Sequence, residues 1–424
     1  MESIIIKGGR ALKGTVTISG SKNAALPILV ASLLTDEKIT LGNLPKLRDI
    51  ETMIQVLTYL GKSIEWQGEK LVINHNGLVR KDAPYELVRQ MRASALVIGP
   101  LLTRHGEVKA SLPGGCAIGA RPINLHLENL ALLGANIQVK EGYVYLSSNG
   151  LQGAHIILGY PSVGATENLL MASVLAHGKT IIENAAIEPE IEDLANFLVK
   201  MGGKIDGIGT NILTVNGVKF LKGISHSVIP DRIEAGTFMT ASAITRGDIH
   251  IKGIVPEHLT VLYSKLEDAG LEISSSAKDE ARVRFNGSNI KAVDIETVPY
   301  PGFPTDMQAQ WIALMCTAKG SSVVSETIFE NRFMHVGELE RMGAHLKIRG
   351  NSVFVQGNDK LSGAQVMATD LRASAALILA GLAAQGKTEI SRIYHLDRGY
   401  ESIEIKLKAL GADIHRVKEK RLLI

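Results

Sequence analysis

One glycine-rich stretch places a thiol close to an arginine, in the order Leu112-Pro113-Gly114-Gly115-Cys116-Ala117-Ile118-Gly119-Ala120-Arg121-Pro122. Adjacent glycines leave the backbone with few steric limits, so this loop can press against a ligand. Proline suits the first helical position, and apolar residues follow at helical spacing, so the sequence predicts a helix that starts at Arg121-Pro122. A helix N-terminus and an arginine both favour anions and make a thiol more reactive. Cys116 is therefore a candidate catalytic thiol, and the alternative is a flexible loop in which the cysteine has no role.

Several basic residues are expected at or near the starts of helices, or in the turns leading to them. They are Lys22, Arg92, Arg121, Arg232, Arg332, Arg372 and Arg398. If the helix N-termini converge, their dipoles and these side chains would bind a small polyanion together. Planar guanidinium groups suit both phosphate and carboxylate. The alternative for any single arginine is a solvated side chain or a local pair, for example with Asp397, but the recurrence favours an anion site.

Asp306 follows Pro304-Thr305 and precedes an apolar helical segment from Met307 to Cys316. A carboxylate in this place most simply caps the helix or lies in its first turn. Asp231 and Asp370 occupy similar places elsewhere in the chain. From the residues alone, we interpret Asp306 as a carboxylate at the start of a helix.

Bulk composition excludes several classes of protein. The chain has 424 residues, long enough for two or three domains, and a net charge of only +3, which does not indicate a nucleic-acid surface. Its two cysteines, Cys116 and Cys316, provide neither a disulfide framework nor metal-ligand spacing, and Cys316 lies in an apolar helical run that predicts an inert core position. No Walker or Rossmann loop is present, so we expect no ATP, NAD, other cofactor or metal. The apolar segments are too short for a signal peptide or a membrane span, so we expect a cytoplasmic protein without membrane insertion.

One pattern recurs six times at a spacing of roughly 70 residues, too long for a solenoid repeat. Each copy has a small-residue helix that is apolar nearly all round, a β-prone run, a second helix, and alternating strands. Helices that are apolar all round belong in an interior, and the alternating strands should cover them. Glycine follows each second helix and is expected to cap it, at Gly61, Gly134, Gly202, Gly270, Gly343 and Gly411. The sequence therefore predicts an α/β fold with helices inside and sheets outside.

Several ordered motifs accompany the cysteine loop along the whole chain. They are Gly20-Ser21-Lys22-Asn23-Ala24, Pro161 to Thr166, Pro230 to Thr237, Pro301 to Asp306, Asp370 to Ala373 and Asp397 to Tyr400. Together they resemble the UDP-N-acetylglucosamine 1-carboxyvinyltransferase family of enolpyruvyl transferases. The resemblance implies a two-domain inside-out α/β barrel of six βαβαββ-type repeats, three in each domain. Residues 22–229 would form a first globe that carries the cysteine loop, and residues 1–21 with 230–424 a second globe. The active site would lie in the cleft between the globes.

The resemblance also implies a reaction. The enolpyruvyl group of phosphoenolpyruvate would pass to the 3-hydroxyl of UDP-N-acetylglucosamine, with release of phosphate, in the first committed step of peptidoglycan synthesis. Cys116 would be the general acid, able to form a covalent phosphoenolpyruvate adduct, and Asp306 the base, with Lys22 and Arg398 also catalytic. Phosphoenolpyruvate would be held by Lys22, Asn23, Arg121, Arg332, Arg372 and Arg398. The UDP-sugar would contact Arg92, Arg121, Pro122, Ile123, Asn124, Leu125, Ser162, Val163, Gly164, Asp306 and Ile328.

Two alternatives remain open at this stage. One is the related transferase whose acceptor is 3-phosphoshikimate, although the Gly-Gly-Cys loop argues against it. The other is a non-catalytic relative that binds a UDP-sugar and regulates the pathway. Two departures from the common pattern, Tyr160 before the Ser162 motif and Asn124 in place of an aspartate, concern nucleotide affinity rather than the reaction. The sequence does not indicate an oligomeric state.

Overall fold

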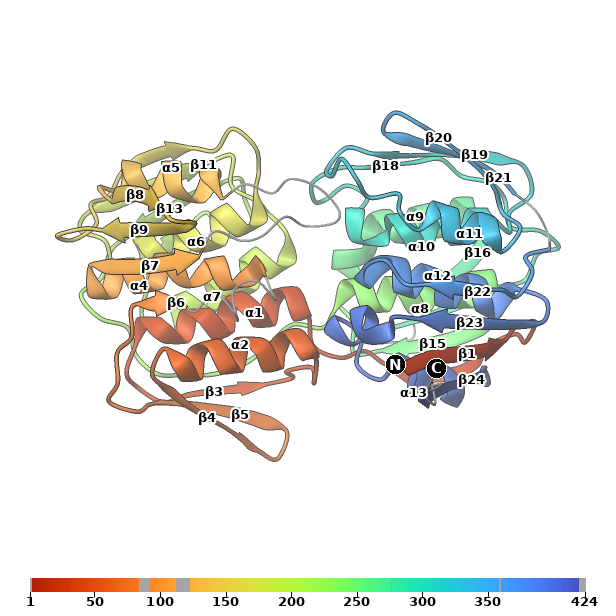
Figure 1. The fold of residues 1–424 in the computed structure, drawn as a ribbon, viewed down its shortest axis with the longest axis horizontal. Coiled ribbons are helices and arrows are strands. Elements are labelled where there is room, and N and C mark those ends of the chain that lie inside the picture. Colours follow the sequence, from red (N-terminus) through yellow and green to blue (C-terminus); the bar gives the residue numbers. More distant parts are fainter. Residues whose placement is uncertain (1, 84–91, 112–122, 276, 358–359, 419–424) are drawn as a thin grey trace. The chain divides into compact units, whose positions relative to one another are not determined.

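A computed structural model describes residues 2–83, 92–111, 123–275, 277–357 and 360–418 (Figure 1). The chain divides into two compact units. Unit 1 comprises residues 2–19 and 230–418, and unit 2 comprises residues 20–111 and 123–229. The chain passes from one unit to the other between Ser19 and Gly20 and again between Ile229 and Pro230.

The elements of unit 2 follow one another in chain order. They are α1 (Lys22–Ala31), η1 (Ser32–Leu34), β3 (Ile39–Gly42), α2 (Arg48–Tyr59), β4 (Lys62–Gln67), β5 (Lys70–His75), β6 (Asp82–Ala83), η2 (Arg92–Val97), α4 (Ile98–His105), β7 (Glu107–Ser111), α5 (Asn124–Leu132), β8 (Asn136–Lys140), β9 (Tyr143–Ser147), β10 (His155–Ile157), α6 (Val163–Ser173), β11 (Lys179–Glu183), α7 (Pro189–Lys200), β12 (Lys204–Asp206), β13 (Ile212–Asn216) and β14 (Ser225–Ser227).

Unit 1 combines the first two strands with the second half of the chain. Its elements are β1 (Glu2–Lys7), β2 (Lys13–Thr17), α8 (Arg232–Ile244), β15 (Asp248–Lys252), η3 (Pro256–Leu259), α9 (Thr260–Asp268), β16 (Leu271–Ser274), β17 (Glu280–Phe285), β18 (Ile295–Thr297), η4 (Thr305–Met307), α10 (Gln308–Met315), β19 (Ser321–Glu326), α11 (Val336–Arg341), β20 (His345–Arg349), β21 (Ser352–Gln356), β22 (Gln365–Met367), α12 (Leu371–Ala383), β23 (Lys387–Ser391), η5 (Ile393–Arg398), α13 (Ile403–Ala409) and β24 (Asp413–Lys418).

Within the described residues, the strands form six four-stranded sheets, three in each unit. The sheet β18-β19-β21-β20 shows the pattern, because β18 runs parallel to β19 while the other neighbours are antiparallel. The parallel step needs a helical crossover, which α10 provides, and the antiparallel strands need only short turns. The predicted βαβαββ repeat is thereby confirmed.

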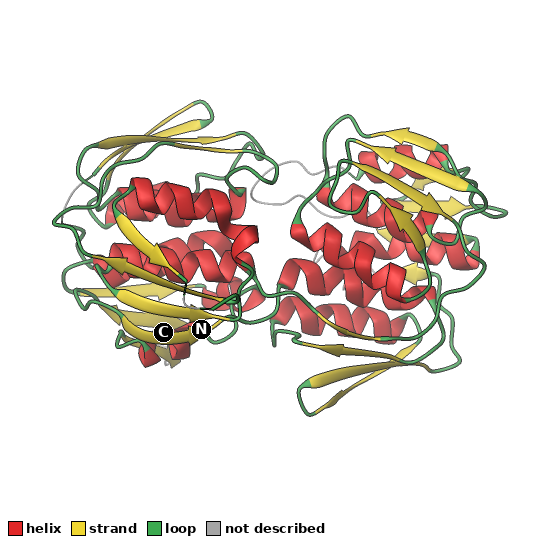
Figure 2. Cartoon of the chain, turned by 180° about the vertical axis from the view of Figure 1, so that it is seen from behind, coloured by secondary structure: helices red, strands yellow, loops and turns green. Residues whose placement is uncertain are grey.

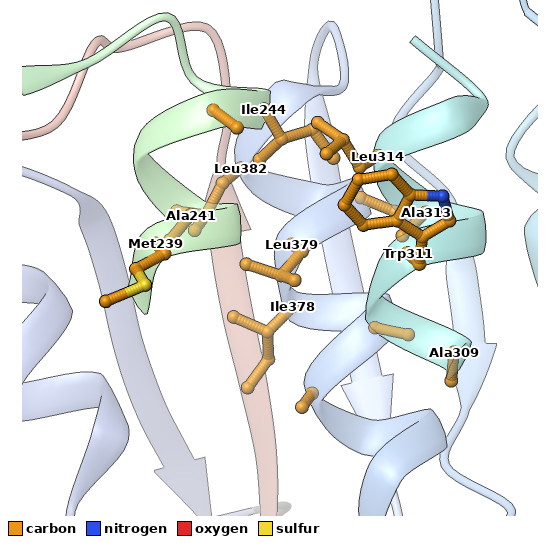
Figure 3. Packing of buried hydrophobic residues seen from close by; sticks show 14 of the residues in the cluster. Met239, Ala241, Ile244, Ala309, Trp311, Ala313, Leu314, Ile378, Leu379 and Leu382 are labelled. Atoms are coloured by element: carbon orange, nitrogen blue, oxygen red, sulfur yellow. The ribbon is translucent and has the colours of Figure 1, made fainter. Parts of the chain in front are cut away.

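The first helix of each repeat lies in the interior, as the sequence predicts. In unit 1, α8, α10 and α12 pack against one another and are buried over nearly their whole length. Figure 2 shows the helices of each unit enclosed by its strands. Figure 3 shows Trp311, Ile378 and Leu382 among the buried side chains of this core. The fold is the predicted inside-out α/β barrel, because helices without a polar face are stable only when other elements cover them.

The glycines that follow the second helices have the expected left-handed backbone. Their φ angles lie between +87° at Gly343 and +112° at Gly61. Residues with a Cβ rarely adopt this conformation, so glycine ends each helix and turns the chain into the next strand. Cys316, predicted to be inert core, is fully buried, and burial raises the pKa of its thiol to about 12.

At each of the two places where the chain changes unit, a strand pairs in one unit and the helix that follows it belongs to the other. β2 pairs in parallel with β15 in unit 1, although α1, the helix after it, belongs to unit 2. β14 pairs in parallel with β3 in unit 2, although α8, the helix after it, belongs to unit 1. Gly20 lies at the first crossing, where a Cβ would come within 1.7 Å of the Asn43 carbonyl oxygen, so no larger residue fits there.

Candidate functional site

Asp306 lies between two guanidinium groups in unit 1. The Nη2 atom of Arg332 donates to Asp306 Oδ1 at 2.6 Å, and the Nη2 atom of Arg372 donates to Asp306 Oδ2 at 2.8 Å. Asp306 lies in η4 immediately before α10, and Arg372 lies in the first turn of α12, which packs against α10. Arg332 comes from the segment between β19 and α11. The structure thus brings together three residues that the sequence analysis predicts for the site.

The two arginines have hydrogen-bonding capacity to spare. Their side chains are only 5% and 4% exposed, whereas that of Asp306 is 26% exposed. Arg332 Nε and Arg372 Nη1 are buried and have no hydrogen-bond partner among the described residues. A buried donor without a partner is costly, by about 1–3 kcal/mol. An anion placed beside Asp306 would satisfy such donors, so this cluster is a candidate anion site.

The same geometry controls the ionisation of Asp306. Burial raises the pKa of Asp306, but the charges of Arg372 and Arg332 lower it more, so it lies well below its ordinary value. Asp306 is therefore ionised at neutral pH and can accept a hydrogen bond from a hydroxyl. A carboxylate with such a low pKa is a weak base, however. An anion that neutralised the two arginines would raise its pKa and make it a stronger base.

Of the two places that the sequence predicts for Asp306, the structure shows the first turn, in η4, and not the helix cap. Asp231 and Asp370 do cap their helices, since each accepts two backbone N–H groups of the first turn. Neither η4 nor α10 has a side-chain cap hydrogen bond within the described residues, and both Asp306 carboxylate oxygens accept from arginines instead. The expected helix from Met307 also differs, because the chain first forms the 3₁₀ turn η4 and α10 begins at Gln308.

Arg398 lies at the end of η5, which packs against α12. Two residues further on, the ring of Tyr400 lies 5.5 Å from the Cζ atom of Arg372. The Tyr400 hydroxyl is 2.9 Å from Thr237 Oγ1 and accepts a hydrogen bond from Gln310 Nε2 at 3.2 Å. Polar side chains of α8 and α10 therefore hold Tyr400 against Arg372, and the segment of Arg398 is fixed next to the Asp306 cluster.

Asp397 could have been a local partner of Arg398. It instead receives two hydrogen bonds from Arg416, at 2.6 and 3.0 Å. This pair connects η5 to β24 and so helps to fix the position of the segment that carries Arg398.

Lys22 and Asn23 open the first inner helix of unit 2. The hydroxyl of Ser21 caps α1 by accepting the backbone N–H of Ala24 at 3.3 Å. Lys22 Nζ lies 3.6 Å from Asp49 Oδ2 in the first turn of α2. Its side chain is largely buried, so Asp49 holds the ammonium group at the start of α1, as an anion-binding role would require.

Ser162, Val163 and Gly164 form the start of α6. The hydroxyl of Ser162 caps this helix by accepting the backbone N–H of Ala165 at 3.3 Å. A Cβ at Gly164 would lie 3.3 Å from the ring of His126 on α5, which leaves little room for a larger residue. The start of α6 and the first turns of α5 are therefore adjacent, so two predicted groups of nucleotide-contact residues meet.

The helix expected at Arg121-Pro122 begins later. Ile123 lies in a turn and α5 starts at Asn124, whereas Arg121 and Pro122, where the start was expected, lie outside the described residues. Ile123 is buried and Leu125 is partly buried, packing against the core of unit 2. Asn124 is exposed, and its Nδ2 donates to Glu128 Oε1 at 3.4 Å.

Some predicted residues lie outside this description. Cys116, Arg121 and Pro122 fall outside the described residues, and of Arg92 only the backbone, at the start of η2, is described. The remaining candidates are distributed over both units. Lys22, Asn23, Ile123 to Leu125 and Ser162 to Gly164 belong to unit 2, whereas Asp306, Ile328, Arg332, Arg372 and Arg398 belong to unit 1.

The sequence analysis missed Thr305 and Glu326. Thr305 Oγ1 accepts from Arg332 Nη1 at 2.6 Å, and Glu326 accepts the hydrogen bond of the Thr305 hydroxyl at 2.7 Å. A signal was available, because the alternation in β19 puts Glu326 on the same inward face as Ser322 and Val324. A carboxylate on an inward face needs partners.

Within the part of the chain that the structure describes, no group of three or more His, Cys, Asp or Glu residues is placed to bind a metal ion. The helices of this part are likewise all too short, or too polar, to cross a membrane.

Comparisons with known proteins give a consistent result. Residues 6–407 match the family EPSP synthase (3-phosphoshikimate 1-carboxyvinyltransferase). The UDP-N-acetylglucosamine 1-carboxyvinyltransferase of Geotalea uraniireducens (strain Rf4) is 59% identical over 420 residues, which cover 99% of this chain and 100% of the relative. The enzyme of the same name from Magnetococcus marinus is 55% identical over 419 residues, which cover 98% and 100%.

Solved structures share the fold. The enolpyruvyl transferase NikO from Streptomyces tendae superposes with a TM-score of 0.89 at 23% sequence identity and covers 99% of both chains. EPSP synthase from Acinetobacter baumannii superposes with a TM-score of 0.77 at 18% identity, covering 99% of this chain and 100% of that one.

Proposed function

The chain belongs to the UDP-N-acetylglucosamine 1-carboxyvinyltransferase family, and we propose from this that it transfers the enolpyruvyl group of phosphoenolpyruvate to the 3-hydroxyl of UDP-N-acetylglucosamine. Relatives with that name match the chain over nearly its full length. The observation that carries the proposal is the Asp306 cluster, in which a carboxylate lies beside two arginines with unused donors. Such a site can hold an anion and accept a proton from a hydroxyl at the same place.

The reaction proceeds by addition and elimination. Asp306 takes the proton of the sugar 3-hydroxyl as its oxygen attacks C2 of phosphoenolpyruvate, and Cys116 gives a proton to C3. The tetrahedral intermediate then loses a proton from C3 and phosphate from C2, which leaves the enolpyruvyl ether. Arg332 and Arg372 stabilise the anionic groups through the transition state, as preoriented charges do. Binding of phosphoenolpyruvate to these arginines also raises the pKa of Asp306, so the base gains strength once this substrate is bound.

The other site residues are part of the same proposal. Lys22, Asn23, Arg121 and Arg398 join the two arginines in binding phosphoenolpyruvate. Residues Arg92, Arg121 to Leu125, Ser162 to Gly164, Asp306 and Ile328 contact the UDP-sugar. Support comes from the start of α6, a helix N-terminus that favours anions and that lies next to His126 of α5.

The proposal extends to the role in the cell. The product is the first intermediate committed to peptidoglycan, and the enzyme acts in the cytoplasm on two soluble phosphorylated substrates. Cys116 forms a covalent adduct with phosphoenolpyruvate and is the target of the epoxide fosfomycin. No metal or organic cofactor takes part, because arginines supply the positive charge and side chains move the protons.

Phosphate release distinguishes the proposal from its alternatives. We expect purified protein to release phosphate from phosphoenolpyruvate when UDP-N-acetylglucosamine is present, and not with shikimate 3-phosphate or without an acceptor. Release with shikimate 3-phosphate alone would make the chain the related transferase. Binding of UDP-N-acetylglucosamine by calorimetry without phosphate release would instead support a regulatory binder.

A further inference from the structure

Glu326, the last residue of β19, accepts hydrogen bonds from two neighbouring segments of unit 1. Its side chain is buried, with the residue only 2% exposed. Oε1 accepts from Thr297 Oγ1 at 2.8 Å and from the backbone N–H groups of Ile328 and Phe329 at 2.8 and 3.2 Å. Oε2 accepts from Thr305 Oγ1 at 2.7 Å. Four donors therefore converge on one carboxylate, which can accept them all.

Thr305 relays this contact to the Asp306 cluster. Because its hydroxyl proton is directed at Glu326, its lone pairs are free to accept a hydrogen bond from Arg332. Arg332 Nη1 donates to Thr305 Oγ1 and Nη2 donates to Asp306 Oδ1, both at 2.6 Å. Two fixed acceptors therefore set the plane of the guanidinium group. Loss of either would let the Arg332 guanidinium group turn away from this orientation, in which it bonds both Thr305 and Asp306.

We propose that Glu326 is a positioning residue for the reaction, acting through Thr305 on Arg332 and Asp306, and through the backbone of Ile328 on the UDP-sugar contact. The inference depends on the proposed function only for its kinetic readout. One buried carboxylate fixes both the charged cluster and the turn that carries Ile328. A residue needed only for folding would affect stability but not the orientation of a catalytic arginine.

Substitutions can separate these roles. In Glu326→Gln, the amide keeps the size of the side chain but replaces one acceptor oxygen with a donor, so the converging donors can no longer all be satisfied. Thr305→Val keeps the shape of the side chain but removes the hydroxyl that bonds both Glu326 and Arg332. Thr305→Ser keeps this hydroxyl and removes only the methyl group. The matched control is Glu183→Gln, at the last residue of β11 in the corresponding repeat, where the carboxylate is half-exposed and bonded to His155 at 2.7 Å.

The test combines steady-state kinetics, thermal unfolding and titration with inorganic phosphate. We expect Glu326→Gln and Thr305→Val to lower kcat about ten- to a hundredfold, because small displacements of a catalytic group have effects of this size. The KM for UDP-N-acetylglucosamine should rise in Glu326→Gln but not in Thr305→Val, since Glu326, unlike Thr305, accepts the backbone N–H groups of Ile328 and Phe329. Thr305→Ser should recover most of the lost kcat, and Glu183→Gln should match the parent.

Turnover of the parent tests the proposed function, and the differences between the variants and the parent test the positioning role of Glu326. A parent without acceptor-dependent turnover would refute the proposed function, and phosphate affinity would then test the positioning role, with weaker binding expected in both Glu326→Gln and Thr305→Val. If Glu326→Gln and Thr305→Val melt at lower temperatures but keep the parental kcat, KM and phosphate affinity, Glu326 has only a structural role. If Glu326→Gln does not fold, Thr305→Val decides the matter, since parental kinetics in that variant would overturn the relay.

Discussion

Replacing Asp306 by asparagine tests the ion-pair geometry directly. The substitution keeps the shape but leaves Arg332 and Arg372 without their shared counter-charge. Removing one partner of a fully buried ion pair costs about 3–5 kcal/mol, and exposed pairs contribute about 0–1 kcal/mol. The arginines are buried while the Asp306 side chain is 26% exposed, so we expect a loss of about 2 kcal/mol. For a domain of this size, that loss lowers the melting temperature by about 4–8 °C.

Scanning calorimetry with and without phosphate is the assay. Phosphate should raise the melting temperature of Asp306→Asn more than that of the parent, because the anion supplies the missing negative charge to both arginines. The matched control is Asp370→Asn, where the carboxylate caps α12 and asparagine caps about as well. This control should melt within about 2 °C of the parent.

The same variant tests the catalytic role. Without a proton acceptor, the addition step should slow about a hundredfold or more, measured as phosphate release under saturating substrates. A variant with parental melting temperature and parental turnover would refute both the ion-pair reasoning and the assignment of Asp306 as the base. A lower melting temperature with parental turnover would leave Asp306 as a structural counter-ion only.

Three further predictions concern other parts of the chain. Cys116→Ser should lower turnover by about two to four orders of magnitude, the usual effect of losing a positioned acid, and fosfomycin should label Cys116 rather than the buried Cys316, as peptide mass spectrometry can show. Burial lowers the pKa of Lys62 from 10.5 to about 8, so above pH 8 the unfolded chain binds more protons than the native state. The free energy of unfolding of the parent should therefore rise by about 2–3 kcal/mol between pH 8 and 10.5, relative to that of Lys62→Met. Urea titrations of the parent and of Lys62→Met at several pH values measure this gain. If residues of both units bind the same substrate, saturating UDP-N-acetylglucosamine should reduce the radius of gyration in small-angle scattering, because the substrate would neutralise like charges that otherwise repel; an unchanged radius would count against this prediction.

Local rules predicted most of the fold. Glycine after each second helix and apolar residues all round each first helix are signals confined to single elements, and both are confirmed by the backbone angles and the burial. The period of two in β19 offered the same kind of local signal for Glu326, which the sequence analysis did not use. Such features are predictable because the cause and the effect lie within a few residues of each other.

The arrangement around Asp306 could not be predicted in the same way. Its partners Arg332 and Arg372 are 26 and 66 residues away in sequence. The packing of α10 against α12 brings Arg372 to Asp306, and Arg332 comes from the segment between β19 and α11. Local reasoning allowed a helix cap or a first-turn position. Asp231 and Asp370 cap their helices, whereas Asp306 lies in the first turn of η4 and bonds two arginines. A carboxylate at a helix start can cap the helix or bond distant arginines, and which of the two it does depends on tertiary contacts.

Product analysis in D₂O tests the central claim most directly. With phosphoenolpyruvate and UDP-N-acetylglucosamine, we predict that nuclear magnetic resonance and mass spectrometry will show one enolpyruvyl ether at the sugar 3-oxygen for each phosphate released. Deuterium should appear in its vinyl group, because C3 gains a solvent-derived proton on addition and loses one on elimination. Phosphate release without this ether, or transfer only to shikimate 3-phosphate, would contradict the proposed reaction, and an ether free of deuterium would contradict its addition–elimination course.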